Sequence, residues 1–232
     1  FTLLTETITF FTRVPLSKFF LSGTWNPTGS SPEFGIWALI IGTLKITVIA
    51  TIVAVPIGLG AAIYLNEYAS DRSRRIIKPI LEILAGIPTI VFGFFALTFV
   101  TPILRNLIPN LGEFNSISPG IVVGIMIVPM ITSMSEDAMS SVPDKIREGA
   151  FGLGATKFEV ATKVVLPAAT SGVVASIVLG ISRAIGETMI VSLAAGSSPT
   201  SSLSLTSSIQ TMTGYIVEIA TGDAAFGSDI YY

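Results

Sequence analysis

The sequence predicts an all-α membrane protein, a polytopic bundle of transmembrane helices, and three observations support this prediction. Half of the 232 residues are hydrophobic, only 12% are charged, and mean hydropathy is +0.77. Four apolar stretches approach or exceed the roughly 20 residues that a helix needs to cross a bilayer. Most of the charges lie in short segments between these stretches, as expected for a chain that crosses the membrane repeatedly.

The four stretches give the predicted complete spans, with one transmembrane domain over residues 1–232. The first span contains one charge, Lys45, which lies near an end where its side chain can reach the interface. The chain begins without Met and ends without a closing apolar stretch, so we expect the domain to be incomplete at both ends. The predicted spans are residues 36–66, 80–104, 117–134 and 171–195.

A polar island, residues 141–167, separates the last two spans and carries seven charged residues. Ser141-Val-Pro-Asp144 predicts a capping box at the start of a first helix. Gly154 can adopt the left-handed conformation that ends a helix. Thr156-Lys-Phe-Glu159 then predicts a second capping box and a second helix ending near Pro167. The island is therefore predicted to be a helical hairpin that projects into water.

Basic residues predict which side of the membrane this hairpin occupies. The segment 67–78 and the hairpin together hold eight basic residues, whereas the loops on the other side hold three. Because cytoplasmic loops carry the excess of Lys and Arg, the hairpin is predicted to be cytoplasmic. The eight are Arg72, Arg74, Arg75, Lys78, Lys145, Arg147, Lys157 and Lys163; the three are Arg13, Lys18 and Arg105.

Composition also disfavours several classes of protein. The chain has no Cys and no His, which removes thiolate chemistry and the usual proton shuttle and metal ligand. Its 13 basic and 15 acidic residues provide no basic field for nucleic acid. No P-loop motif occurs, and the glycines of residues 149–154 follow no strand, so no nucleotide or dinucleotide site is expected.

Arg183 lies in the middle of the fourth predicted span, where a guanidinium costs about 2.5–3.5 kcal/mol to insert. Glu187 follows four residues later, which predicts an ion pair on one helix face. Such a pair either fixes helix packing or lines a substrate pathway. Because buried ion pairs add little stability, we favour the pathway.

The hairpin carries the motif through which a family resemblance enters. Glu148-Gly149-Ala150, then Gly154 six residues after Glu148, then Leu166-Pro167 twelve residues after Gly154, resembles the EAA motif of inner-membrane permease subunits of bacterial ABC importers. Gly149 departs from the Ala that gives the motif its name. The resemblance implies that these six residues couple the permease to an ATP-hydrolysing subunit.

A second segment narrows the resemblance. Arg183-Ala-Ile-Gly-Glu187-Thr188-Met189 is similar to a stretch of the phosphate-specific permeases of the PstC type. This similarity implies a type I ABC importer (MetI-like) fold of six spans that passes inorganic phosphate. Arg183, Glu187 and Thr188 would then line the substrate pathway.

The resemblance also implies partners and a location. They are a second, PstA-like permease, two ATPase subunits that hold ATP and Mg, and an extracytoplasmic phosphate-binding protein. No cofactor or metal is expected on this chain, and no nucleic acid. The chain would lie among the lipids of the bacterial cytoplasmic (inner) membrane.

Other functions remain open on the residues alone. A permease for another oxyanion, molybdate or sulfate, fits the hairpin equally well. An intramembrane enzyme would need Asp or Ser chemistry within the spans, but no Asp lies inside them and Ser182 lacks a His base. A transporter driven by an ion gradient would leave the hairpin unexplained.

Overall fold

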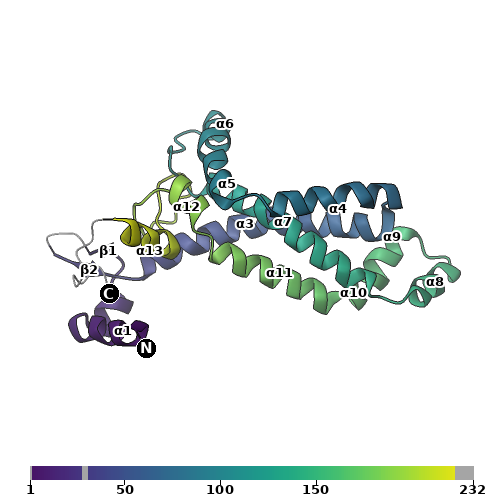
Figure 1. Cartoon of the computed structure of the whole chain (residues 1–232), viewed down its shortest axis with the longest axis horizontal. Helices are drawn as coiled ribbons and strands as arrows, with labels where there is room; N and C mark the ends of the chain where they lie inside the picture. The colour runs from purple at the N-terminus through teal and green to yellow at the C-terminus, as the bar shows by residue number, and fades with distance from the viewer. Residues whose placement is uncertain (1, 28–30, 223–232) are drawn as a thin grey trace. The chain divides into compact units, whose positions relative to one another are not determined.

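The computed structural model describes residues 2–27 and 31–222, most of which are helical (Figure 1). The chain divides into two compact units. Unit 1 comprises the described residues within 1–48, 89–122 and 185–232, and unit 2 comprises residues 49–88 and 123–184. Two long helices, α3 (Trp37–Ile63) and α7 (Ile117–Ser140), contribute residues to both units.

The membrane-helix prediction is confirmed within the described ranges. Three helices there are long and apolar enough to cross a membrane: Trp37–Tyr68, Thr89–Leu107 and Ile117–Ser140. A fourth candidate is a pair of helices, Lys157–Ala168 and Thr170–Ile185, bent by 76°. Helices suit these sequences because lipid offers no partner to a free backbone N–H or C=O.

The second predicted span begins too early. Residues 80–85 belong instead to α4 (Asp71–Ala85), an amphipathic helix that also replaces most of the predicted basic loop. Ser70 caps α4, since its Oγ accepts a hydrogen bond from Ser73 N at 3.2 Å. Pro88 restricts the residue before it to extended backbone, so the chain breaks after α4. The span itself comprises α5 (Thr89–Phe95), the π-helical η2 (Ala96–Val100) and α6 (Thr101–Leu107).

The fourth predicted span, residues 171–195, is wrong in its second half. The helix α11 (Thr170–Ile185) ends before Gly186, and a separate short helix, α12 (Met189–Ala194), follows. Residues 195–211 are irregular, as their Ser- and Thr-rich composition predicts, and α13 (Met212–Thr221) comes after them.

In unit 2 the helices α3, α7 and α11 pack through small residues. A Cβ added at Gly58 or at Gly180 would lie 2.9 Å from side-chain atoms of Ile131. Ser135 and Ser176 share a buried hydrogen bond of 2.6 Å between α7 and α11. Small residues and interhelical hydrogen bonds are what bring membrane helices together, because lipid provides no hydrophobic drive.

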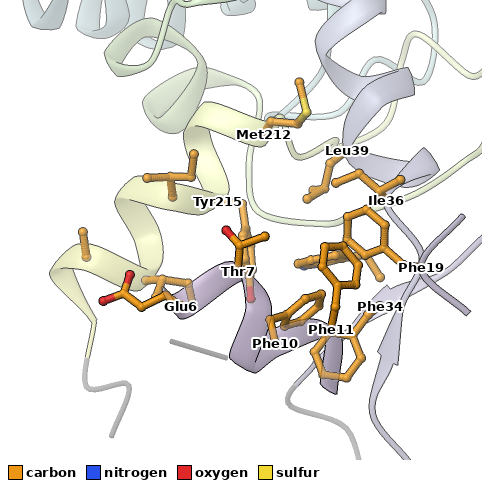
Figure 2. Close-up of a pocket in the computed structure, with 14 residues that line it drawn as sticks. Glu6, Thr7, Phe10, Phe11, Phe19, Phe34, Ile36, Leu39, Met212 and Tyr215 are labelled. Carbon is orange, nitrogen blue, oxygen red and sulfur yellow. The ribbon is translucent and has the colours of Figure 1, made fainter. Parts of the chain in front are cut away.

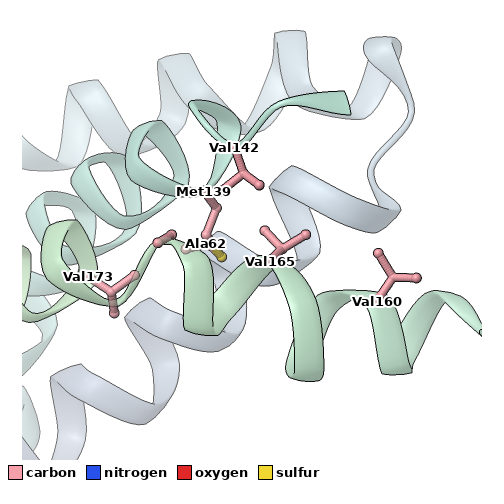
Figure 3. Close-up of a cluster of buried hydrophobic side chains, with 7 residues drawn as sticks. Ala62, Met139, Val142, Val160, Val165 and Val173 are labelled. Carbon is pink, nitrogen blue, oxygen red and sulfur yellow. The ribbon is translucent and has the colours of Figure 1, made fainter. Parts of the chain in front are cut away.

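An apolar cluster lies in unit 2 where the hairpin packs against the long helices. Figure 3 shows its side chains gathered from α3, α7, α11 and the helical segments of the hairpin. These segments are α8 (Asp144–Gly152), α9 (Lys157–Glu159), the π-helical η3 (Val160–Val165) and α10 (Leu166–Ala168). The buried members are Ala62, Met139, Val142, Val160, Val165, Ala169 and Val173.

Unit 1 is organised around short elements. Helices α1 (Thr2–Arg13) and α2 (Leu16–Leu21) precede a two-residue antiparallel pair, β1 (Trp25–Asn26) and β2 (Glu33–Phe34), in which Trp25 faces Phe34. Helix α5 packs closely on α12, since a Cβ at Gly93 would lie 3.2 Å from Ile190 Cα.

The close approach of α11 to α7 predicts the effect of one methyl group. A Cβ at Gly172 would lie 2.5 Å from Ala138 Cβ, so Gly172→Ala should destabilise the chain by about 1–3 kcal/mol. Gly60→Ala is the matched control, because nothing lies within 4 Å of its added Cβ and Ala favours the helix. Thermal unfolding in detergent measures both, and equal midpoints would contradict this packing.

Candidate functional site

The predicted helical hairpin is confirmed, with Gly154 at its turn. Helix α8 ends at Gly152, and Gly154 adopts the left-handed conformation with φ of 85°. The turn is closed by two backbone hydrogen bonds, from Gly154 N to Phe151 O at 2.9 Å and from Ala155 N to Ala150 O at 3.1 Å. Helix α9 then begins at Lys157.

The two predicted capping boxes have opposite outcomes. The first is wrong, because Pro143 caps α8 and Ser141 Oγ donates instead to Ala138 O at 2.7 Å. Ser141 directly follows α7, so its hydroxyl bonds to the Ala138 carbonyl of that helix and not to the start of α8. The second is confirmed: Thr156 Oγ1 accepts from Glu159 N at 3.3 Å, and the Glu159 carboxylate accepts from Thr156 N at 3.1 Å.

The same contacts fix the charge of this second cap. The hydrogen bond from the Thr156 backbone, followed by the Lys163 ammonium at 3.1 Å, lowers the pKa of Glu159 to about 2. A carboxyl with a lowered pKa supports the fold above its ordinary pKa of 4.5 and loses that contribution as pH falls toward 2. The cap is therefore charged and intact at neutral pH.

The six motif residues divide into two groups. Glu148, Gly149, Gly154 and Pro167 are exposed. Ala150 and Leu166 are partly buried and pack against the apolar cluster of unit 2. The motif thus places some residues on the surface while others fasten the hairpin to the helices behind it.

The hairpin also exposes large apolar side chains. Leu153, beside the turn, is 92% exposed, and Phe158, on α9, is 67% exposed. Phe151 and Ile146 of α8 are exposed as well. Exposed apolar side chains rimmed by charges are typical of a surface that binds another protein.

The predicted ion pair on one helix face is wrong. Arg183 is half-buried on α11, but α11 ends at Ile185, so Glu187 lies beyond that helix. The Glu187 side chain is buried and accepts a hydrogen bond from Ile190 N at 3.3 Å, in the first turn of α12. Thr188, which follows, is partly exposed, and its Oγ1 donates to Gly186 O at 3.2 Å.

Lys45, which is predicted to reach the interface, has backbone partners in the structure. It is buried in α3 and its Nζ donates to the carbonyl oxygens of Ser202 and Ser204, the latter at 2.9 Å. An ammonium group in this position fixes the Ser- and Thr-rich segment to the helix. The charge within an apolar stretch was visible in the sequence, whereas its partners were not.

Two further charged contacts escaped sequence reasoning. Arg147 of α8 donates to Asn66 Oδ1 at 3.1 Å and to Met139 O at 2.7 Å. Lys78 of α4 lies 2.6 Å from the buried carboxylate of Glu136 on α7. Both contacts lie within unit 2 and fasten separate helices near the hairpin.

Unit 1 contains an aromatic cavity of about 560 Å³ (Figure 2). Rings meet edge to face around it, including Phe10 with Phe34 at 5.6 Å and Trp25 with Tyr215 at 5.0 Å between centroids. Such edge-to-face contacts are a favourable arrangement for buried rings. None of the predicted site residues lines this cavity.

Comparison with known proteins identifies the family. Residues 54–227, which include the whole hairpin and the Arg183–Thr188 segment, match the family of binding-protein-dependent transport system inner membrane components. The chain belongs to this family. It is therefore a multi-pass protein of the cytoplasmic membrane, in a family of transport permease subunits.

Individual relatives agree with the PstC-type resemblance. The chain is 36% identical to the probable ABC transporter permease YqgH of Bacillus subtilis, over 91% of this chain and 68% of that protein. It is 37% identical to the phosphate permease PstC of Haemophilus influenzae and 35% identical to that of Xylella fastidiosa, over 78% of this chain in each case. The chain spans 63% and 61% of the length of these two permeases.

A solved structure supports the MetI-like fold. A chain of the methionine ABC transporter MetNI, in an inward-facing conformation, matches with a TM-score of 0.50 and 21% sequence identity. The match covers 66% of this chain and 68% of that chain. At this identity the likeness concerns the fold, and it confirms the predicted permease architecture.

The turn of the hairpin predicts a destabilisation that comes from backbone strain and not from side-chain packing. No atom lies within 4 Å of a Cβ added at Gly154, but its φ of 85° strains any L side chain, so Gly154→Ala should cost the hairpin about 1–2 kcal/mol. Gly152→Ala is the control, because Gly152 is helical and its added Cβ also meets nothing. Hydrogen exchange at Gly154 and Ala155 should speed up in the first variant alone; similar exchange in both would contradict the account.

Proposed function

We propose that this chain is a permease subunit of an ATP-driven importer that moves inorganic phosphate across the cytoplasmic membrane. The observation that carries the proposal is the 35–37% identity to two proteins named as phosphate permeases, over 78% of this chain. The Arg183–Thr188 segment supports it independently, because a guanidinium presents paired donors that match phosphate oxygens.

Within this proposal Arg183, Glu187 and Thr188 line the pathway. Arg183 binds the phosphate oxygens through its fork of N–H groups. The Glu187 carboxylate, anchored to Ile190 N, keeps the empty pathway from holding an anion too tightly. Thr188 contributes a hydroxyl group, which donates to Gly186 O in this structure and would turn toward a bound anion. Transport requires such balanced binding, because an anion held tightly would not leave.

The hairpin, residues 141–167, would couple this single transmembrane domain, residues 1–232, to ATP hydrolysis. Its exposed tip, with Leu153 and Phe158, suits a cleft in an ATPase subunit. Two such subunits would bind ATP and Mg, because no P-loop occurs in this chain. A PstA-like permease and an extracytoplasmic phosphate-binding protein complete the proposed assembly.

The proposed coupling to ATP hydrolysis implies a transport cycle. ATP binding would close the two ATPase subunits and draw the hairpins of the two permeases together. Motion of the hairpins would tip the spans from an inward-open to an outward-open arrangement, so that the binding protein can deliver its anion. The Glu148, Gly149, Ala150, Gly154, Leu166 and Pro167 motif is the proposed contact at which this motion enters the chain.

The assignment of Arg183 to the pathway predicts a selective loss of phosphate uptake. In vesicles carrying the full-length protein with its ATPase and binding protein, Arg183→Gln should lower ATP-dependent phosphate uptake about 10- to 100-fold, the effect of losing a charged hydrogen bond. Arg105→Gln, at the exposed end of α6, makes the same charge change and should leave uptake near wild type. Normal uptake in Arg183→Gln would make Arg183 structural. Uptake of sulfate or molybdate in place of phosphate by the wild type would refute the substrate and keep the permease.

A further inference from the structure

Arg147 fastens the hairpin to the rest of unit 2. Its side chain is only 16% exposed, although it begins on α8, whose neighbouring residues are mostly exposed. The guanidinium donates to Asn66 Oδ1 at 3.1 Å and to Met139 O at 2.7 Å, and lies 3.6 Å from the Glu67 carboxylate. One side chain therefore joins α8 to the end of α7 and to the segment after α3.

That segment is the π-helical turn η1 (Tyr64–Tyr68), which continues α3. A second arginine holds it from another helix: Arg74 of α4 donates to Leu65 O at 2.7 Å and to Asn66 O at 3.3 Å. Single π-helical turns of this kind are frequent at functional sites. The turn η1 is thus fixed by α4 and by the hairpin at once.

The helices that meet at η1 are also joined to each other. Lys78 of α4 lies 2.6 Å from Glu136 of α7, and the Glu136 side chain is 3% exposed. Glu136 precedes Met139, the residue whose carbonyl accepts from Arg147, by one turn of α7. The contacts of Arg147 therefore belong to a network of charged contacts shared by α4, α7, α8 and η1.

Three features indicate that Arg147 positions the hairpin more than it stabilises the fold. A buried ion pair adds little to the free energy of unfolding, whereas removal of one partner leaves a charge without compensation. The planar fork of a guanidinium fixes direction as well as distance. Its acceptors come from η1, which continues the long apolar helix α3, and from α7, which is itself a long apolar helix.

We propose that Arg147 is the positioning residue that makes the hairpin, η1 and the end of α7 move as one body, so that displacement of the hairpin reaches α3 and α7. Arg147 lies outside the six motif residues and does not contact the anion in this account. The inference rests on the proposed coupling to an ATPase and adds the internal contact through which that coupling acts.

The test uses the assembled transporter in proteoliposomes, with phosphate uptake and ATP hydrolysis measured on the same sample. Arg147→Gln should still assemble and hydrolyse ATP, while the phosphate moved per ATP falls by at least about tenfold, an ordinary coupling free energy. Arg147→Lys should behave likewise, because an ammonium lacks the fork. Arg72→Gln makes the same charge change at an exposed residue of α4, outside the hairpin and outside the contacts of Arg147, and should change the ratio less than about twofold.

Each alternative outcome counts against the proposal. A wild-type ratio in Arg147→Gln overturns it, as does full rescue by Arg147→Lys. A parallel fall in uptake and hydrolysis indicates a structural role. If Arg147→Gln does not assemble, Glu67→Gln takes its place, because it neutralises the partner carboxylate while keeping its shape. A wild-type ratio in Glu67→Gln would likewise overturn the proposal.

Failure of the phosphate assignment would be recognised separately. A wild-type complex that hydrolyses ATP but moves no phosphate refutes the proposed substrate. The stimulation of ATP hydrolysis by the binding protein then reports coupling without reference to the anion, and it should be lost in Arg147→Gln and kept in Arg72→Gln. Stimulation that persists in Arg147→Gln would refute the positioning role.

Discussion

The largely buried guanidinium of Arg147 imposes the constraint on which the arrangement of unit 2 depends. A charge removed from water needs partners, and its partners here are a side-chain amide, a backbone carbonyl and a carboxylate from two other elements. Because those partners are fixed in turn by α4 and α7, the water-exposed hairpin is joined to the apolar helices by directional contacts. The apolar cluster around Met139 then fills the space that these contacts define.

The proposed permease function involves the same elements in one mechanism. The exposed tip of the hairpin offers apolar side chains to a partner, while Ala150 and Leu166 hold its inner side on the cluster. The small residues between α3, α7 and α11 let these helices pack closely against one another. The proposed anion contacts lie elsewhere, on α11 and before α12, so the proposed coupling to ATP hydrolysis and the proposed substrate specificity are assigned to different residues of this chain.

Sequence reasoning predicted what depends on local composition and on spacing. Apolar length identified the helices, and Gly154 and the Thr156–Glu159 box identified the turn of the hairpin, because their partners lie within a few residues. The points at which one helix ends and another begins are harder to predict. The spacing of Arg183 and Glu187 predicts one continuous helix with an ion pair, whereas the Glu187 carboxylate lies beyond α11 and accepts a hydrogen bond from Ile190 N. Contacts such as Lys45 with Ser202, 157 residues apart, have no local signal.

The most direct test of the account is a distance within unit 2 through the transport cycle. The chain has no cysteine, so Tyr68→Cys on η1 and Gly152→Cys on α8, both exposed, provide a unique pair for spin labels in the assembled complex. If the hairpin and η1 move as one body, the distance distribution should be the same without nucleotide and with ATP bound. A distribution that shifts with ATP would show that the hairpin moves independently of α3, and would contradict the central claim.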